Sequence, residues 1–501
     1  MNNVLILVDY IRTNACAQSF AGDVSFAGIL AEKTKLLAQQ LKADIVLLTD
    51  NNTSTDAAAR YGSAKLVAWE GAADSASYFS RIRDIAEGYG DIVHIKGDTP
   101  LIDVHETLRA FAQHREQFAF YTYGENYPEG VLPCIYKRGT LDRLIPLAEE
   151  KKAPLVWNSV HDTVFIDPNF FEIEVVISPE DMRYHRLSFR ASSRRNVLII
   201  QRLAADDHAL AYPDMIKKLK AQPALRRTLP AYVEIELTTR QNLYPVYFPF
   251  APGDRTDAEL PYEAFCASYQ RMADAVGDIH VSFSLYGEPL LHSDIKRIIS
   301  AALEPPSATV YLETNGLLFD RAFADYILAL NNDRLKIIFH LDAIDSELYA
   351  SLYRNGDLTK VLGNIEYYLT RENKNAYMQI RKMKDNLEHL MAYYKYFEKY
   401  DVTIILQKYD SIRRTLPDAE AGNLAPLVKT CCWHLARDMA ILADGRTVLC
   451  KEDCRGEHTL GNFLTDDFQT LWRNGERYYL ENIGNKLPFC DTCNEWYTYN
   501  F

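Results

Sequence analysis

The sequence lacks a long apolar run and an excess of positive charge. No stretch approaches the ~18 apolar residues that a membrane helix requires. The opening residues carry no basic flank and lead into only five strongly apolar residues, 4–8, so we expect no signal peptide. With 55 Lys and Arg against 68 Asp and Glu, the formal net charge of −13 disfavours nucleic acid as a partner. We therefore expect a cytoplasmic protein that binds neither membrane nor nucleic acid.

Glycine and proline are also scarce, which excludes disorder or a fibrous repeat as the main state. The 501 residues include 22 Gly and 20 Pro, with 48% hydrophobic and 25% charged residues, as in ordinary globular proteins. A chain of this length exceeds what one hydrophobic core usually organises. Several domains are expected.

Cysteines are few and unevenly placed. Of the nine, six lie between Cys431 and Cys493. In a cytoplasmic protein such a concentration favours metal binding over disulfide pairing. Cys16, Cys134 and Cys266 stand apart, and we interpret them as ordinary core or surface thiols.

Short apolar segments alternate with helical patterns, which predicts an α/β fold with mostly parallel sheets. In the first part, strands are expected at residues 4–8, 43–48 and 91–95. Beyond a linker at residues 221–230, six more are expected at residues 233–237, 280–283, 309–312, 335–339, 377–380 and 402–406. A helix is expected at residues 358–369. Six β/α units predict a partial barrel, and we place the domains at 1–222, 230–415 and 427–501.

Four cysteines near the end of the chain have the spacing of a metal site. Cys432 and Cys450 enclose seventeen residues with a hairpin-turn signal around Gly445, and Cys490 and Cys493 form a Cys-x-x-Cys pair. Four thiolates suit either a [4Fe-4S] cluster or tetrahedral zinc, and spacing alone does not separate the two. Either Cys431 or Cys454 could replace one of the four predicted ligands.

The order of motifs around these cysteines is similar to a known domain. Between Cys450 and Cys490 come Leu460-Gly461-Asn462 and Leu471-Trp472. Over roughly the last 75 residues this arrangement resembles the SPASM or twitch extension of radical S-adenosylmethionine enzymes, in its one-cluster form. The resemblance implies one [4Fe-4S] cluster, with zinc as the alternative metal.

The resemblance extends upstream, but the radical centre is missing. Radical S-adenosylmethionine enzymes carry Cys-x-x-x-Cys-x-x-Cys after the first barrel strand. Here the corresponding positions are Gln241, Pro245 and Phe248. None of these side chains binds iron as a thiolate does. We expect no reductive cleavage of S-adenosylmethionine.

Other parts of the expected cofactor pocket are present. Gly287-Glu288-Pro289 resembles the family's Gly-Gly-Glu-Pro segment, Asn315 lies in a Thr-Asn-Gly strand end, and Asp342 ends a later strand. The resemblance implies that these residues could hold S-adenosylmethionine or an amino-acid ligand. The alternative is a purely structural role, because Gly-Glu-Pro also suits a turn that ends a strand.

The first domain carries a different motif. Gly97-Asp98-Thr99-Pro100-Leu101, directly after the strand at 91–95, resembles the metal-site strand end of cytidylyltransferase-like nucleotidyltransferases of the GT-A type. The resemblance implies Mg²⁺ bound by Asp98. However, residues 9–15 contain no glycine, and none appears until Gly22, so a phosphate-binding loop is not evident. Asp98 could instead cap a turn.

Taken along the full length, the chain resembles spiro-SPASM proteins. The expected fold is a nucleotidyltransferase-like α/β domain, a partial (β/α)₆ barrel like that of radical S-adenosylmethionine enzymes, and a small SPASM domain. Our first hypothesis is an iron-sulfur-binding protein whose barrel is a non-radical scaffold or ligand-binding part in peptide or glycan modification. The expected partner is a peptide, a protein or a sugar nucleotide.

Two alternatives of another class remain. The first is a Mg²⁺-dependent nucleotidyltransferase that uses Asp98 and acts on a sugar phosphate. The second is an enzyme that binds S-adenosylmethionine without a cluster and transfers a methyl group.

Overall fold

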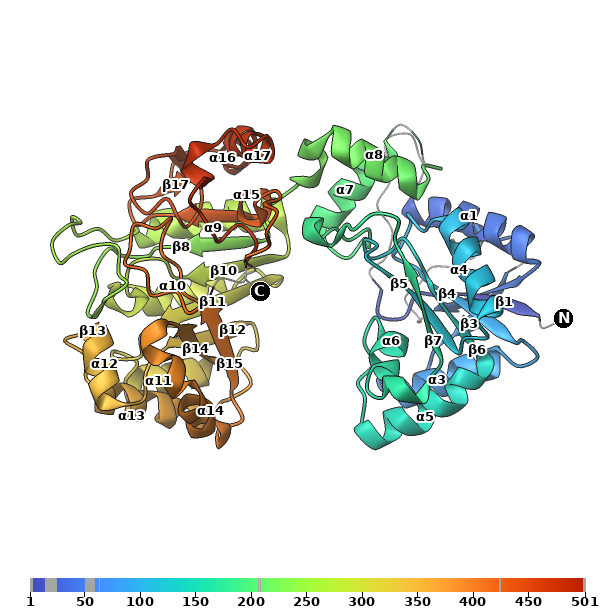
Figure 1. The fold of residues 1–501 in the computed structure, drawn as a ribbon, viewed down its shortest axis with the longest axis horizontal. Helices are drawn as coiled ribbons and strands as arrows, with labels where there is room; N and C mark the ends of the chain where they lie inside the picture. Colours follow the sequence, from blue (N-terminus) through green and yellow to red (C-terminus); the bar gives the residue numbers. More distant parts are fainter. Residues whose placement is uncertain are drawn as a thin grey trace. The chain divides into compact units, whose positions relative to one another are not determined.

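The computed structural model describes residues 3–13, 25–49, 59–62, 64–205, 207, 209–422 and 425–498. Cys16, Gly22 and residues 14–15 of the glycine-free segment 9–15 lie outside these ranges. The chain divides into two compact units, Met1–Thr228 and Leu229–Phe501, and the boundary falls within the predicted linker (Figure 1). Each unit is considered by itself below.

The first unit is built on a seven-stranded sheet in the order β3-β2-β1-β4-β6-β5-β7. Strands β1 to β4 run parallel, whereas β6 is antiparallel to both its neighbours. Every residue of β1 is buried, as expected for a parallel strand covered on both faces. The three strands predicted here correspond to β1, β2 and β4. The strands are β1 Val4–Asp9, β2 Asp44–Thr49, β3 Lys65–Ala68, β4 Asp91–Lys96, β5 Tyr121–Glu125, β6 Cys134–Lys137 and β7 Ile173–Ile177.

Helices connect these strands, and several begin at a residue whose side chain caps the first turn. Asp74, Asp103 and Ser193 each accept a hydrogen bond from a backbone N–H of the helix that follows. The helices of this unit are α1 Phe26–Leu41, α3 Ser75–Ile85, α4 Val104–Glu116, α5 Arg138–Lys151, α6 Ser159–Val164, α7 Arg194–Ala204 and α8 Tyr212–Ala221, with 3₁₀ turns η1 Pro168–Phe170, η2 Arg183–His185 and η3 Pro223–Arg226.

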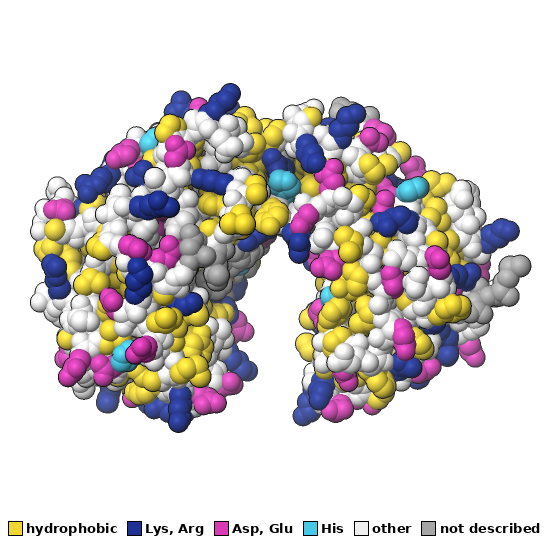
Figure 2. Space-filling model, in the orientation of Figure 1, with side chains coloured by type: hydrophobic (Ala, Val, Ile, Leu, Met, Phe, Trp, Pro, Cys, Tyr) yellow, Lys and Arg dark blue, Asp and Glu magenta, His cyan; other side chains and the backbone are white. Residues whose placement is uncertain are grey.

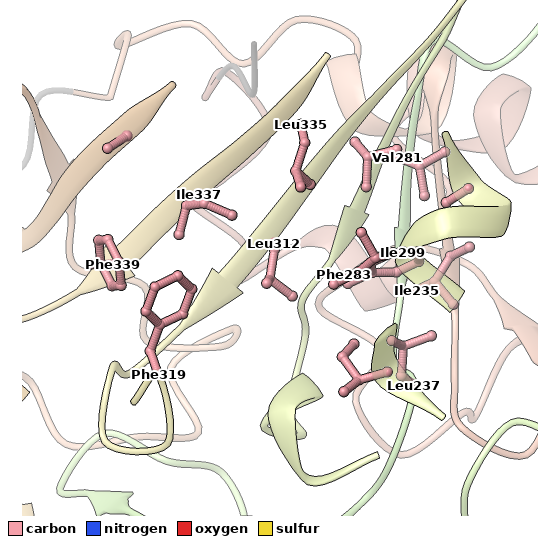
Figure 3. Close-up of a cluster of buried hydrophobic side chains, with 14 of the residues drawn as sticks. Ile235, Leu237, Val281, Phe283, Ile299, Leu312, Phe319, Leu335, Ile337 and Phe339 are labelled. Carbon is pink, nitrogen blue, oxygen red and sulfur yellow. The ribbon is translucent and has the colours of Figure 1, made fainter. Parts of the chain in front are cut away.

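The second unit contains the predicted partial barrel. Six strands, adjacent in the order β15-β14-β12-β11-β10-β8, are all parallel and correspond to the six predicted ones. Side chains of neighbouring strands, including Ile235, Val281 and Leu312, meet in one apolar cluster (Figure 3). The strands are β8 Tyr232–Ile235, β10 Ile279–Phe283, β11 Ala308–Thr314, β12 Leu335–His340, β14 Ala376–Lys382 and β15 Thr403–Lys408, with a two-stranded pair β9 Tyr244–Pro245 and β13 Tyr353–Arg354 beside them.

Helices alternate with these strands. The predicted helix at 358–369 has the same bounds as α13 Leu358–Leu369, whose Asp357 cap accepts from Lys360 N. The other helices around the barrel are α9 Tyr262–Val276, α10 Ile295–Ala302, α11 Arg321–Leu330, α12 Ser346–Leu352 and α14 Leu390–Glu398, with 3₁₀ turns η4 Pro289–Leu291 and η5 Lys384–His389.

The cysteine-rich tail continues the sheet of the barrel. Strand β16 Asp438–Ile441 pairs in parallel with β8, and β17 Arg446–Val448 and β18 Thr459–Asn462 follow antiparallel. The expected hairpin turn contains Gly445 at φ 84°, a conformation that favours glycine. The tail also contains α15 Trp433–Arg437, α16 Phe468–Asn474, α17 Glu476–Ile483 and η6 Pro488–Cys490.

The described helices include none that is both long and apolar enough to cross a bilayer. On the face shown in Figure 2, acidic and basic side chains are interspersed over the surface of each unit.

Candidate functional site

The four predicted metal ligands come from separate elements of the tail and lie together. Cys432 is the N-cap of α15, Cys450 follows β17, Cys490 ends η6 and Cys493 lies three residues further on. Cys432 and Cys490 are buried in one apolar cluster, against which Cys450 packs. Each of Cys432, Cys490 and Cys493 acts electrostatically on the thiol of Cys450. We call these four residues the cysteine quartet.

The environment of the quartet opposes free thiolates. Burial raises the pKa of Cys432 and Cys450 well above the usual value, and neighbouring thiols raise both further. Burial raises the pKa of Cys490 as well, and that of Cys493 to about 12. Since metals bind the thiolate, a cation must displace these protons. The donor set therefore fits a metal group that is held by four sulfurs and shielded from water.

Neighbouring groups fix the positions of the quartet. Asn482, which is buried on α17, accepts a hydrogen bond from Cys432 N at 2.8 Å and also interacts with the Cys490 thiol. The ammonium of Lys429 donates to the carbonyl of Cys490. These contacts tie ligands that lie about sixty residues apart in the sequence.

The spacing of the quartet is wider than that of a preformed single-metal site. Within the described ranges, the only set of three or more His, Cys, Asp or Glu whose ligand atoms all lie within 4.8 Å of one another is Asp453, Glu457 and His458. No three sulfurs of the quartet meet that criterion.

A partly buried network of charges lies beside the quartet. Lys451 Nζ is 3.2 Å from both Asp410 and Glu495, and Lys408 forms a further ion pair with Glu495. Lys451 follows Cys450 and Glu495 follows Cys493, while Lys408 belongs to β15 of the barrel. The network therefore links the segment that contains Cys450 and the segment that contains Cys493 to a barrel strand.

The two spare cysteines have different surroundings. Cys431 packs against the same apolar cluster as the quartet. Cys454 belongs to another cluster, with Phe250, Tyr286 and Val448. The choice of ligands among the six tail cysteines stays a prediction, and the quartet is the set that the geometry brings together.

In the barrel, the three positions that lack cysteine still converge. Gln241, Pro245 and Phe248 line one cavity of about 100 Å³. Gln241 Nε2 donates to the carbonyl of Tyr286 at 2.7 Å, and Phe248 packs edge-on against Phe250, which contacts Tyr286 in the same way. The three positions that carry cysteines in the related enzymes are therefore occupied here by an amide, a proline ring and a phenyl ring that line one cavity.

Three of the predicted cofactor residues, Gly287, Glu288 and Asn315, line this cavity, whereas Pro289 and Asp342 do not. Glu288, which is buried, accepts from Thr314 Oγ1 at 2.8 Å and from the backbone N–H of Leu290 and Asn315. Burial raises the pKa of Glu288 to about 7. Pro289 begins η4, and the Asn315 amide donates to Asn242 Oδ1 at 2.7 Å. Their assignment to a cofactor stays a prediction.

Asp342 is also satisfied internally. Its carboxylate accepts from Arg381 N at 2.7 Å and from Tyr353 Oη at 2.8 Å, and Tyr247 donates to it as well. Tyr247 lies between Pro245 and Phe248, so Asp342 helps to hold the loop that would carry the missing cysteines.

In the first unit, Asp98 is buried at the end of β4. Trp157 Nε1 donates to Asp98 Oδ1 at 2.9 Å, and Arg190 Nη2 lies 3.4 Å from Oδ2. Burial raises the pKa of Asp98, although Arg190 and Trp157 act in the opposite direction. Both oxygens of Asp98 are engaged within the chain, and its assignment to Mg²⁺ stays a prediction.

A cavity of about 310 Å³ lies beside Asp98. Its walls include Lys96, Tyr123, Trp157 and His161. Lys96 is paired with Asp9 at 2.5 Å. Burial alone would raise the pKa of Asp9. Lys96 and His94 act in the opposite direction and hold this pKa well below the usual range. One wall of the cavity is therefore formed by a lysine that pairs with the buried Asp9, which the sequence motif did not reveal.

Sequence reasoning missed several residues of these sites. Asn482, Lys451 and Glu495 carry no motif of their own and are recognisable only because the fold brings them to the quartet. Trp157 and Arg190 come from segments far from Asp98 in the sequence. Lys451 directly follows Cys450, and Glu495 lies two residues after Cys493; this closeness in the sequence was the one signal that could have pointed to Lys451 and Glu495.

Comparison with known proteins is consistent with this geometry. Residues 431–494 match the SPASM family, described as an iron-sulfur cluster-binding domain. A Treponema pallidum (strain Nichols) protein described as uncharacterized is 32% identical over 362 residues, which is 68% of this chain and 98% of that protein. The chain belongs to this family of spiro-SPASM-like proteins. The match places the whole cysteine quartet inside the SPASM domain.

Several solved structures show weaker similarity. The structure of Streptococcus suis SuiB bound to precursor peptide SuiA is 15% identical in sequence to this chain, with a TM-score of 0.43. The match covers 57% of this chain and 74% of the SuiB chain. A Leptospira borgpetersenii cytidylyltransferase is 17% identical, covers 44% and 95%, and gives a TM-score of 0.36. At these values the likeness carries no argument about function.

Proposed function

We propose that this chain is a cytoplasmic iron-sulfur protein whose barrel is a non-radical scaffold or ligand-binding part in the modification of a peptide or glycan. The observation that carries the proposal is the contrast between two sites in one unit. The tail gathers four cysteines within a SPASM domain, of which Cys432 and Cys490 are buried and Cys450 and Cys493 are partly buried. The barrel has Gln241, Pro245 and Phe248 where the radical enzymes have three cysteines.

The cysteine quartet would hold one [4Fe-4S] cluster, which supplies electron storage or structural stability when bound. The chain's own contribution is to bury the four sulfurs and to exclude water. Asn482 contacts the backbone of Cys432 and Lys429 contacts that of Cys490, so these two residues help to position the ligands.

The sulfur spacing supports iron and sulfide over zinc. A tetrahedral zinc ion with Zn–S bonds near 2.3 Å holds its sulfurs about 3.8 Å apart. No three quartet sulfurs lie within 4.8 Å of one another. A cluster distributes its thiolates over four irons and accommodates a wider arrangement.

The small barrel cavity argues against S-adenosylmethionine, with or without a cluster. At about 100 Å³ it is well below the ~300 Å³ at which sites for drug-sized ligands begin. Glu288, Asn315 and Asp342 all use their polar atoms within the chain. Methyl transfer from S-adenosylmethionine is therefore the least supported of the three hypotheses.

A second candidate function is Mg²⁺-dependent nucleotidyl transfer by the first unit. The cavity of about 310 Å³ beside Asp98 favours a ligand there. The engagement of Asp98 by Trp157 and Arg190 disfavours a metal. Release of pyrophosphate from CTP with a sugar phosphate, lost on Asp98→Ala, would support this function; indifference to all nucleoside triphosphates in calorimetry would remove it.

The test of the main proposal is metal analysis of single cysteine variants, purified anaerobically. We expect Cys490→Ala to lose most of its iron and sulfide, whereas Cys134→Ala in the first unit keeps both. Neither protein should form 5′-deoxyadenosine from S-adenosylmethionine under reducing conditions. Retention of iron in Cys490→Ala, or 5′-deoxyadenosine from the wild type, would refute the proposal.

A further inference from the structure

Two polar atoms beside the barrel cavity have no hydrogen-bond partner among the described residues. They are Gln241 Oε1 and Ser284 Oγ, and both residues line the cavity of about 100 Å³. Ser284 is 8% exposed, so its side chain is shielded from bulk water. Leu285, which follows Ser284 and also lines the cavity, has φ 71°, a conformation that is rare for leucine and that clusters at binding sites. Since unpaired polar atoms are unfavourable in a protein interior, two of them at one cavity indicate a bound molecule.

The local structure fixes how these two atoms are presented. Gln241 Nε2 donates to the carbonyl of Tyr286 at 2.7 Å. Because a carbonyl only accepts, the amide keeps this orientation, and Oε1 is left as a hydrogen-bond acceptor. Ser284 directly follows β10, and side chains alternate along a strand. Ser284 therefore lies on the same face as Ser282, whose hydroxyl donates to Glu313 Oε1 at 2.5 Å.

The cationic side chain of the cavity wall is already engaged. Among the described residues that line the cavity, Arg381 is the one with a permanent positive charge. Its Nη1 lies 3.4 Å from Asp342 Oδ2, and its Nη2 donates to His340 Nδ1 at 3.2 Å. Because a guanidinium only donates, Nδ1 is the accepting nitrogen of His340, and the ring carries its proton on Nε2. The positive charge of Arg381 is therefore committed to groups of the chain.

Two carboxyl groups belong to the same wall. Glu313 accepts from His340 Nε2 at 2.9 Å. Burial alone would raise the pKa of Glu313, but the hydrogen bonds from His340 and Ser282 lower it, so this carboxylate is charged. Glu288 accepts from Thr314 Oγ1 and from backbone N–H groups, and burial raises its pKa to about 7. A negatively charged ligand would meet both carboxyl groups, whereas a positively charged donor would meet acceptors.

We propose that the barrel cavity binds a primary ammonium group, which donates hydrogen bonds to Gln241 Oε1 and Ser284 Oγ and is balanced by the charge of Glu313. The inference deepens the proposed role of the barrel as a ligand-binding part and rests on it. The volume of about 100 Å³ limits the ligand to a small group, such as the end of a short alkylammonium chain. Two sources carry this chemistry, a free small amine and the lysine side chain of a peptide.

The experiment is isothermal titration calorimetry of the full-length chain, purified anaerobically, with n-butylammonium. Butyrate and n-butanol are the anionic and neutral probes of similar size. We expect only butylammonium to bind, with one molecule per chain. Ser284→Ala and Gln241→Met should each weaken its binding about tenfold or more, because each removes a hydrogen bond to a charged group. Ser351→Ala, at an exposed position of α12, should bind as the wild type does.

A short peptide separates the two sources of the ammonium group. The probe is Gly-Lys-Gly with both ends blocked, compared with the same peptide in which norleucine replaces the lysine. If the lysine peptide binds more tightly than butylammonium and the norleucine peptide does not bind, the ligand is a peptide side chain. If butylammonium binds and neither peptide does, the ligand is a free amine. Both results support an ammonium site.

The contrary outcomes are distinct. No binding of butylammonium in the millimolar range, a preference for butyrate, or unchanged binding in either Ser284→Ala or Gln241→Met overturns the inference. Ser284→Ala should keep the melting temperature of the wild type, because its hydroxyl has no partner to lose among the described residues. Iron is measured in the same samples. A chain that holds iron but ignores ammonium overturns only this inference, and a chain without iron overturns the proposed iron-sulfur function.

Discussion

At the scale of single residues, the Gly287-Glu288-Pro289 segment packs closely against the backbone of residues 238–240. A Cβ atom on Gly287 would lie 1.6 Å from the carbonyl oxygen of Thr238. Glu288 N donates to the carbonyl of Arg240 at 2.9 Å. The segment is therefore packed backbone to backbone against the start of the loop that lacks its cysteines.

We predict that Gly287→Ala destabilises the second unit by about 3 kcal/mol or more, because the methyl group meets backbone that cannot rotate away. The matched control is Gly363→Ala. Gly363 is exposed within α13 with nothing near its Cβ position, so alanine should stabilise by about 1 kcal/mol. Urea unfolding followed by circular dichroism measures both, and equal effects would contradict the close packing.

A second residue-scale prediction concerns Glu288 and pH. Its pKa rises from 4.5 to about 7 on folding, because burial disfavours the charged form. The folded state then binds the proton more tightly than the unfolded state. The stability that the neutral carboxyl contributes is fully present below pH 4.5 and is lost as the pH rises through about 7.

Between these limits the free energy of unfolding of the wild type should fall by up to about 3 kcal/mol, and that of Glu288→Gln should not show this fall. Urea midpoints measured across this pH range give the difference. Glu304→Gln, at an exposed site, should follow the wild type. Parallel curves for wild type and Glu288→Gln would show that the pKa is not raised.

At the scale of elements, the tail is joined to the barrel at the end of β8. Glu236, which is fully buried, accepts from Ala443 N at 3.1 Å and forms a two-pronged ion pair with Arg255. Ala443 lies in the hairpin between β16 and β17 that leads to Cys450. This ion pair therefore connects the first barrel strand with the cysteine site.

We predict that Arg255→Met lowers the free energy of unfolding by about 3–5 kcal/mol, because it leaves the Glu236 carboxylate buried and unpaired. The double variant Glu236→Gln/Arg255→Met should recover most of that loss, because the amide oxygen still accepts from Ala443. Arg297→Met, which breaks an exposed pair with Asp294, should change stability by less than about 1 kcal/mol. Equal losses in the single and double variants would exclude a charge effect.

How much of the fold and of the candidate site could be predicted from the sequence differs from one element to the next. Buried parallel strands are continuous apolar runs, so β1, β10 and β12 were predictable within a residue or two. The antiparallel β6 was not predicted, since its direction depends on the partners β4 and β5. The quartet was predictable from spacing. The partners of Glu288 and Asp98 were not, because Thr314 and Arg190 reach them only through the tertiary fold.

At the scale of the whole molecule, the chain has two separate sets of cores. The apolar clusters around Leu7, Phe189 and Val8 belong to the first unit, and those around Val233 and Cys432 to the second. The tail shares the nine-stranded sheet of the barrel, so the three expected domains form two compact units. The proposed metal site therefore lies in the same compact unit as the barrel.

We predict two calorimetric unfolding transitions. Removal of iron by a chelator should lower the temperature of one transition, that of the second unit, because a ligand stabilises only the unit that binds it. The isolated fragment 1–228 should reproduce the other transition. A shift of both transitions on iron removal would contradict the assignment of the metal to the second unit.

The most direct test of the account is the iron, acid-labile sulfide and zinc content of the native chain, purified under strict anaerobiosis. The account predicts about four irons and about four sulfides per chain, in keeping with one [4Fe-4S] cluster. About eight irons would reveal a second cluster rebuilt in the barrel, and zinc without sulfide would replace the cluster by a different metal. Either result would contradict the central claim.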